Sequence, residues 1–128
     1  MDDALELVFF SAGGLTLAVE SVKVQDLREA AGSDAPTMAD LLGLPPPANR
    51  AVIAQQRLLR LIRPAGMLTL RVDEPVMQDR LSATALYPLP PLVQARLTLP
   101  GVQALARWHC AAGETLVIIL DPDCLPVS

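Results

Sequence analysis

Apolar residues occupy every second position from 5 to 9 and again from 15 to 19, and the segment Ala-Gly-Gly at 12–14 lies between these two runs. A period of two is the side-chain period of a β-strand, and small residues with glycine favour a tight turn. The pattern therefore predicts a β-hairpin over residues 5–19. A third extended run follows at 22–27. Because an isolated hairpin is only marginally stable in water, the rest of the chain is expected to supply further strands.

Two more hairpins are predicted from the same kind of pattern. Residues 57–62 and 67–73 flank the turn sequence Arg-Pro-Ala-Gly at 63–66, and residues 101–109 and 114–120 flank a turn at 110–113. Residues 114–120 (ETLVIIL) are too apolar for exposure on either face, which predicts a central strand. Arg57, Arg60 and Arg63 are spaced for one helical face, but the alternation after Gly66 favours a strand whose arginines form a solvated edge.

The connecting segments contain one predicted helix. Residues 29–36 are small and polar and indicate a loop, whereas Thr37, Asp40 and Gly43 have the spacing of an N-cap, a capping-box acid and a C-terminal glycine. Three prolines at 45–47 and the segment 49–56 are interpreted as connectors. Residues 76–81 are a candidate short strand. The proline-rich stretch 82–91 cannot be a central strand and is expected to form a surface loop or single turn.

These elements predict an all-β fold, a mostly antiparallel barrel or sandwich with one short helix. The length of 128 residues suits one domain, and a content of 52% hydrophobic but 3% aromatic residues predicts a core of aliphatic side chains. No apolar run reaches the length of a membrane-spanning helix, and the acidic N-terminus favours a cytoplasmic protein. A net charge of −4 disfavours nucleic acid as a partner.

Few residues of the chain could act as catalytic groups or metal ligands. Cys110 and Cys124 are interpreted as small apolar residues, because a cytosolic protein rarely keeps a disulfide. A thiol-dependent or ligand-binding site would have to combine His109 with Cys110 or Asp121, and neither these spacings nor the pair Asp121 and Asp123 match a usual metal site. Without a phosphate loop or a nucleophile elbow, we expect no catalytic residue, metal or cofactor.

Five segments resemble, in order, elements of the CheW family, the coupling proteins of bacterial chemotaxis, which share their fold with the regulatory domain of the CheA histidine kinase. The segments are LVFF at 7–10 followed by two glycines and the run 15–19, VKVQDLR at 22–28, DLLGLP at 40–45, LRVD at 70–73, and LVIIL at 116–120 followed by aspartate. The resemblance implies a single CheW-like domain over residues 1–128. It would consist of two small SH3-like antiparallel barrels around a shared core, one of them shortened.

The chain departs from this pattern between Arg28 and Met38. The family carries a longer segment there with a motif of the type P…GVxNLRGxxxPV, whose arginine contacts a partner, and this chain has only EAAGSDAPT. The chain is therefore expected to be a divergent, shortened coupling protein. The alternative is a degenerate CheW-like protein with another partner in a chemosensory or pilus system.

The resemblance implies a non-enzymatic scaffold that joins a CheA-type histidine kinase regulatory domain to a chemoreceptor signalling domain. Motif matches place partner contacts at Val24, Asp26, Leu59, Thr69 and Val76. Among these, the three apolar residues would give apolar contact, and Asp26 and Thr69 would fix register through hydrogen bonds. Core packing is the alternative role for the apolar three. The oligomeric state stays open.

Overall fold

The structure is a computed structural model that describes residues 4–12, 15–29, 34–43, 56–64, 66–88, 101–110 and 113–124. The proline triplet 45–47 and residues 49–55 of the predicted connectors lie outside this part of the chain. The strands are β1 (Ala4–Ala12), β2 (Leu15–Glu20), β3 (Val24–Glu29), β4 (Gln56–Leu61), β5 (Leu68–Ser82), β6 (Leu86–Pro88), β7 (Val102–Cys110) and β8 (Gly113–Leu120). The helix α1 (Met38–Leu42) and the 3-10 turns η1 (Ser21–Lys23), η2 (Ala83–Ala85) and η3 (Pro122–Cys124) complete the described elements.

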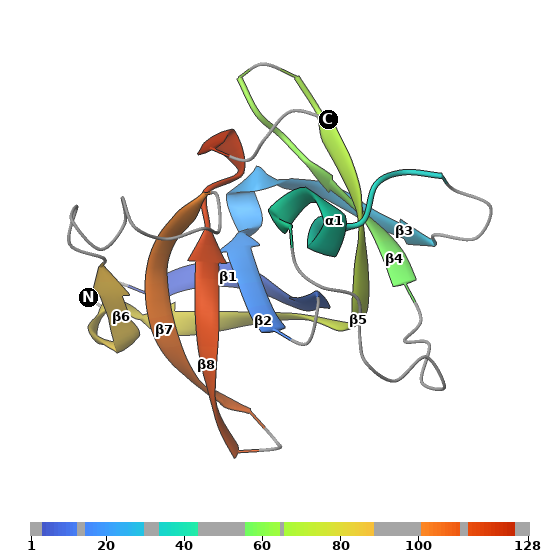
Figure 1. Cartoon of the computed structure of the whole chain (residues 1–128). Coiled ribbons are helices and arrows are strands. Elements are labelled where there is room, and N and C mark those ends of the chain that lie inside the picture. Colours follow the sequence, from blue (N-terminus) through green and yellow to red (C-terminus); the bar gives the residue numbers. More distant parts are fainter. Residues whose placement is uncertain are drawn as a thin grey trace.

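The strands form one strongly curved sheet in the order β3-β4-β5-β1-β2-β8-β7-β6 (Figure 1). All three predicted hairpins are confirmed, as β1 with β2, β4 with β5, and β7 with β8, each antiparallel. The hairpins are joined where β2 pairs with β8 in parallel, through Leu17 with Ile118 and Ala18 with Ile119. The expected central strand at 114–120 is therefore confirmed, because β8 has a neighbour on both sides.

Two hydrophobic clusters lie on opposite faces of the strands that they share. Along β1, Phe10 and Ala12 enter a first cluster, whereas Leu7 and Phe9 enter a second. The strands β2 and β8 divide their side chains in the same way, and β3, β4 and α1 contribute only to the first cluster. Successive side chains of a strand point to opposite faces, so a strand buried on both faces serves two cores at once. The predicted all-β, two-barrel fold is confirmed, with this shared wall between its halves.

The strand β5 links the two halves and corrects one prediction. Residues 76–81 are not a separate short strand, because β5 runs without interruption through all 15 residues from Leu68 to Ser82. Its first part pairs with β4 as far as Asp73, and its second part pairs with β1 from Asp73 onward. The register with β1 shifts between Phe9 and Ser11, and an irregularity of this kind bends a strand. The interval between the predicted strands 67–73 and 76–81 is where β5 changes its pairing strand from β4 to β1.

The helix α1 has the predicted ends. The Thr37 hydroxyl accepts a hydrogen bond from the Asp40 backbone amide at 3.0 Å, and Gly43 ends the helix at φ 70°, in the left-handed region that favours glycine. Met38 and Leu42 point into the first cluster. The residues before the helix lie beside β5, where the Arg71 amide donates to the Pro36 carbonyl at 2.9 Å. The helix therefore covers one opening of the first barrel.

Two element boundaries and the burial of one residue differ from the predictions. The run expected to be extended from residue 22 begins as η1, and β3 starts only at Val24 and continues to Glu29. The stretch 82–91 contains a turn, as expected, but residues 86–88 also form the strand β6 at the sheet edge. Leu116 is exposed, although 114–120 was expected to be covered on both faces. The face of β8 that carries Leu116 is covered only further along the strand, where Ile118 and Leu120 meet the first cluster.

The second barrel is held closed by contacts of β7 with β1 and β5, which are not its neighbours in the sheet. The Trp108 ring on β7 stacks on Phe9 of β1, with a centroid separation of 4.0 Å and an interplanar angle of 10°. The indole Nε1–H donates to Asp79 Oδ2 on β5 at 2.9 Å, and the Arg80 amide donates to Asp79 Oδ1 at 2.8 Å. Trp108 therefore connects β1, β5 and β7.

This closure predicts a pH dependence of stability. The indole N–H of Trp108, and secondarily the Arg80 amide, hold the pKa of Asp79 below its ordinary value of 3.8. A carboxyl whose pKa is lower in the folded state adds stability that is present above pH 4 and is lost as pH falls through the folded-state pKa. We expect the free energy of unfolding in urea to fall less between pH 5 and pH 2.5 in Asp79→Asn than in the parent protein. Equal falls in both would contradict this assignment.

Candidate partner-binding surface

The outer face of β3, β4 and β5 is the first feature of the candidate surface. Leu59 and Leu61 of β4, with Leu68 and Leu70 of β5, point into the first cluster. By alternation, the outward positions are those of Arg60 and Ile62 on one side of the turn at 63–66 and of Met67 and Thr69 on the other. Arg57, Arg60 and Arg63 were expected to form a solvated edge, which is wrong for Arg57 and Arg60, because both lie on β4, between β3 and β5.

Arg60 is the centre of the polar contacts on this face. Its Nη1 donates to Asp26 Oδ2 of β3 at 3.0 Å, and its Nη2 donates to the Met67 sulfur at 2.9 Å. The strand register places Asp26 opposite Arg60 and Arg60 opposite Thr69. Two of the predicted residues, Asp26 and Thr69, are thus brought together around an arginine that the sequence analysis did not select. The ion pair is partly shielded from water, with Arg60 and Asp26 side chains 27% and 30% exposed.

An exposed apolar patch lies at one end of this face. Its members are Val22 on η1 at 74% exposure, Ile62 at 42% and Met67 at 49%. The Ile62 amide donates to the Lys23 carbonyl at 2.7 Å, which holds η1 beside the β4–β5 turn. We call Val22, Ile62 and Met67 the barrel-end patch. Large apolar side chains that gather on an otherwise polar surface are typical of a protein–protein contact.

The other three predicted residues lie nearer the core. Val24 and Val76 are partly buried and pack against the first cluster. Leu59 is 0% exposed, so its side chain packs in the core and has no surface open to a partner in this fold. For Leu59 the alternative role, core packing, therefore replaces the predicted contact. Partner contact by Val24, Asp26, Thr69 and Val76 stays a prediction.

None of the three residues of the barrel-end patch was among the predicted partner contacts. Ile62 and Met67 flank the predicted turn, where a hairpin leaves its last outward side chains uncovered, and this position was the available signal. Val22 gave no such signal, because it belongs to the predicted extended run 22–27, in which alternation places it on the same face as Val24. Its exposure follows from η1, which turns the backbone before β3 begins. Strand alternation alone therefore placed this side chain wrongly.

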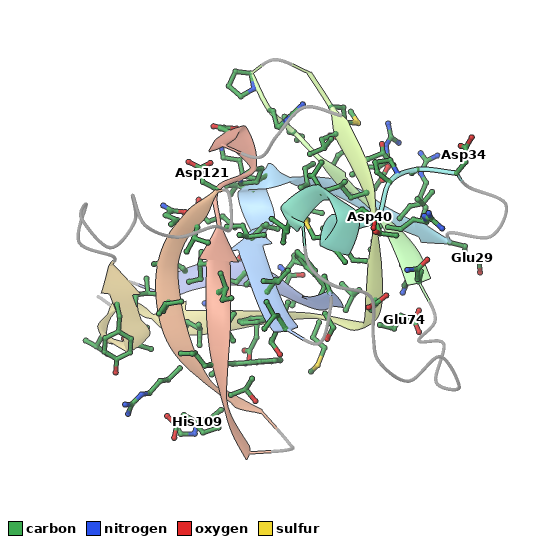
Figure 2. All side chains as sticks on the ribbon, in the orientation of Figure 1. Glu29, Asp34, Asp40, Glu74, His109 and Asp121 are labelled. Atoms are coloured by element: carbon green, nitrogen blue, oxygen red, sulfur yellow. The ribbon has the colours of Figure 1, made fainter. Side chains whose placement is uncertain are left out.

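Of the residues considered for chemistry, His109 and Asp121 are not brought together. His109 lies opposite Glu114 at the turn end of the β7–β8 hairpin, whereas Asp121 follows the other end of β8 (Figure 2). Asp121 Oδ1 accepts a hydrogen bond from the Asp123 amide at 3.0 Å, as expected of turn residues. The side chains of Cys110 and Cys124 lie outside the described part. In the described ranges, no group of three or more His, Cys, Asp or Glu could hold a metal ion.

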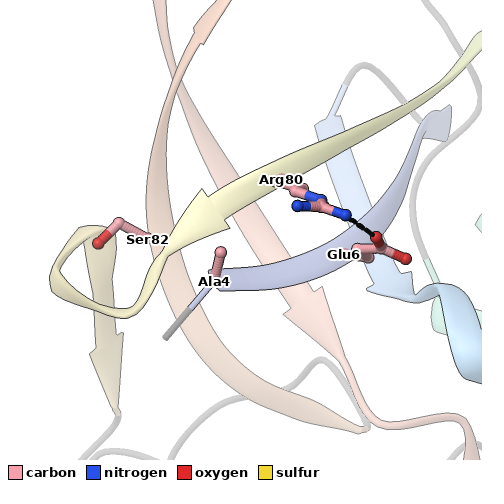
Figure 3. Close-up of a pocket in the computed structure, with 4 residues that line it drawn as sticks. All are labelled: Ala4, Glu6, Arg80 and Ser82. Atoms are coloured by element: carbon pink, nitrogen blue, oxygen red, sulfur yellow. Dashed lines mark hydrogen bonds and ion pairs between the residues drawn. The ribbon is translucent and has the colours of Figure 1, made fainter. Parts of the chain in front are cut away.

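A surface depression beside β1 and β5 is lined by Ala4, Glu6, Arg80 and Ser82 (Figure 3). Arg80 Nη2 donates to Glu6 Oε1 at 2.7 Å, so the two charges on its wall neutralise each other. Both side chains are largely in water, where such a pair contributes little binding or catalytic power. The Ser82 hydroxyl forms a hydrogen bond with the Thr84 hydroxyl at 2.9 Å, and the carboxylate in the lining, Glu6, is paired with Arg80.

Comparison with solved structures identifies the fold. The chain superposes on the scaffolding protein TtCheW from Thermoanaerobacter tengcongensis with a TM-score of 0.70 over 96% of this chain and 86% of that chain. The chain has the CheW fold. The two sequences are 14% identical, no family model matches the chain, and no curated protein matches it. Among the described helices, none is long and apolar enough to cross a bilayer. At this identity the likeness establishes the CheW fold and leaves the partners to be tested.

Proposed function

We propose that this protein is a single-domain, non-enzymatic adaptor of a chemotaxis-type signalling system, which binds a CheA-type histidine kinase regulatory domain, a chemoreceptor signalling domain, or both. The observation that carries the proposal is the barrel-end patch on a CheW fold. The scaffolding role of TtCheW and the sequence resemblance supply the class of partner. A cytoplasmic location, where such kinases and receptor tips meet, is part of the proposal.

The patch has the composition of a binding centre with a polar rim. Val22, Ile62 and Met67 provide exposed apolar area, and the ion pair of Arg60 with Asp26 borders it. Apolar centres surrounded by charged residues are the usual arrangement in protein interfaces. Because Arg60 already donates to both Asp26 and Met67, the rim is held in one geometry before a partner arrives. Less side-chain entropy is then lost on association.

Replacing both Ile62 and Met67 with aspartate is expected to weaken binding of the kinase regulatory domain from the same organism roughly 100-fold, because two apolar anchors become charges. Isothermal titration calorimetry measures the change, and circular dichroism confirms that the variant is folded. The matched control is the double variant Met77→Asp, Leu116→Asp. It adds the same charge at two exposed apolar positions outside the patch and should bind like the parent.

These binding measurements test both the position of the interface and the class of partner. Equal weakening by the patch variant and the control would move the interface away from β4 and β5. If the parent binds neither a kinase regulatory domain nor a receptor signalling domain, the proposed coupling function is wrong. The alternative, a CheW-like protein with another partner, would then take its place. The shortened segment between Arg28 and Met38 is the feature of the chain that favours this alternative.

A further inference from the structure

The strand β3 lies at one edge of the sheet, and we propose that it pairs antiparallel with β3 of a second copy of this chain to form a two-fold dimer. Within the described ranges, β4 is the strand that pairs with β3, and none pairs with its other edge. An edge strand presents a row of backbone N–H and C=O groups that another extended strand can complete. The side chains of β3 indicate which strand that is.

When two copies of β3 run antiparallel, residues of complementary charge and polarity lie opposite each other. Pairing about Leu27 places Leu27 opposite Leu27 of the second copy and Asp26 opposite Arg28. It also brings Gln25, where the register of β3 with β4 shifts between Val24 and Asp26, near Glu29 of the second copy. Each of the last two contacts occurs twice because of the two-fold axis. Directly opposed residues with opposite charges stabilise a strand pair, and an amide beside a carboxylate can donate to it. The register therefore gives two ion pairs and two amide–carboxylate contacts around one apolar pair.

Other registers of the same pairing are disfavoured. A shift of two residues in one direction places Asp26 opposite Asp26 of the second copy, and the reverse shift places Arg28 opposite Arg28. Like charges at opposed positions are destabilising. A shift of one residue would place Leu27, which packs against the first cluster, on the same face as the outward Asp26. The pairing of opposite charges and the inward position of Leu27 thus favour the register about Leu27.

The charged groups are available for this contact. The Arg28 side chain is 63% exposed, and its Nε lies 3.3 Å from Asp26 Oδ2. Glu29 projects from the end of β3 away from the sheet (Figure 2), and Gln25 is also exposed. The Asp26 side chain is 30% exposed, and its Oδ2 is the atom that both Arg60 and Arg28 of the same chain approach. In the dimer, the four charges of Asp26 and Arg28 from both copies would form one alternating network.

The first test is sedimentation velocity over a concentration range up to about millimolar, with the purified chain alone. The parent should dimerise reversibly, and Arg28→Glu should raise the dimer dissociation constant roughly tenfold or more, because both ion pairs become repulsive. The matched control is Arg107→Glu on β7. Arg107 is 64% exposed and, like Arg28, has one neighbouring carboxylate, that of Glu114 at 3.6 Å. This control should dimerise like the parent.

The second test fixes the register. In a Cys110→Ser, Cys124→Ser background, the pair Gln25→Cys, Glu29→Cys should form a disulfide between position 25 of one copy and position 29 of the other, identified by peptide mass spectrometry. Gln25→Cys alone should not cross-link, because the two copies of position 25 lie far from the axis. A monomer at every concentration, a dimer unaffected by Arg28→Glu, or equal weakening by Arg107→Glu would each overturn the proposal. Neither test involves a kinase or receptor.

Discussion

Trp108→Ala is expected to lower the free energy of unfolding by about 3–5 kcal/mol, the usual cost of truncating a large buried aromatic residue. Trp108 fills the second cluster, stacks on Phe9, and donates its indole N–H to Asp79. The substitution removes all three contacts and leaves a cavity where β1, β5 and β7 meet. Urea denaturation at pH 7 measures the loss.

Trp108→Phe distinguishes the contribution of the stacked ring from that of the indole hydrogen bond. It keeps an aromatic ring near Phe9 but cannot donate to Asp79, so we expect a loss of about 1–2 kcal/mol. This variant should also remove most of the acid sensitivity assigned to Asp79, because the principal cause of its lowered pKa is gone. If the phenylalanine and alanine variants lose the same stability, the hydrogen bond and not the stacked ring closes the second barrel.

Leu59→Asp is the second large effect, with an expected loss of about 4 kcal/mol or more, because a charge would replace a fully buried side chain in the first cluster. Ile62, the residue that follows the end of β4, supplies the comparison. Ile62→Asp places the same charge at an exposed position, where substitutions usually change stability by less than about 0.5 kcal/mol. Thermal unfolding followed by circular dichroism distinguishes the two variants.

This pair of variants also separates a loss of folded protein from a loss of binding surface in the binding experiment. Weaker partner binding by Leu59→Asp would reflect loss of folded protein, whereas weaker binding by Ile62→Asp would reflect the surface itself. If both variants were equally stable, the alternation of β4 between core and surface would be wrong. The barrel-end patch would then have to be redefined.

The sequence by itself determined the local elements. Alternation of apolar residues, the turn residues between the runs, and the spacing of Thr37, Asp40 and Gly43 were enough for three hairpins and one helix, because each depends on interactions between near neighbours in the chain. The order of short motifs was enough to indicate the CheW fold. It also led to Asp26 and Thr69 on the face that surrounds Arg60.

Only the tertiary structure decided which apolar side chains are core and which are surface. Alternation says that two faces of a strand differ, but it does not say whether another element covers each face. Leu59 and Leu116 are both leucines on strands, yet one is enclosed by the first cluster and the other is open to water. Long-range contacts also divided β1 between two cores and brought Val22 beside the β4–β5 turn. Such contacts join residues far apart in the chain, and no local pattern specifies them.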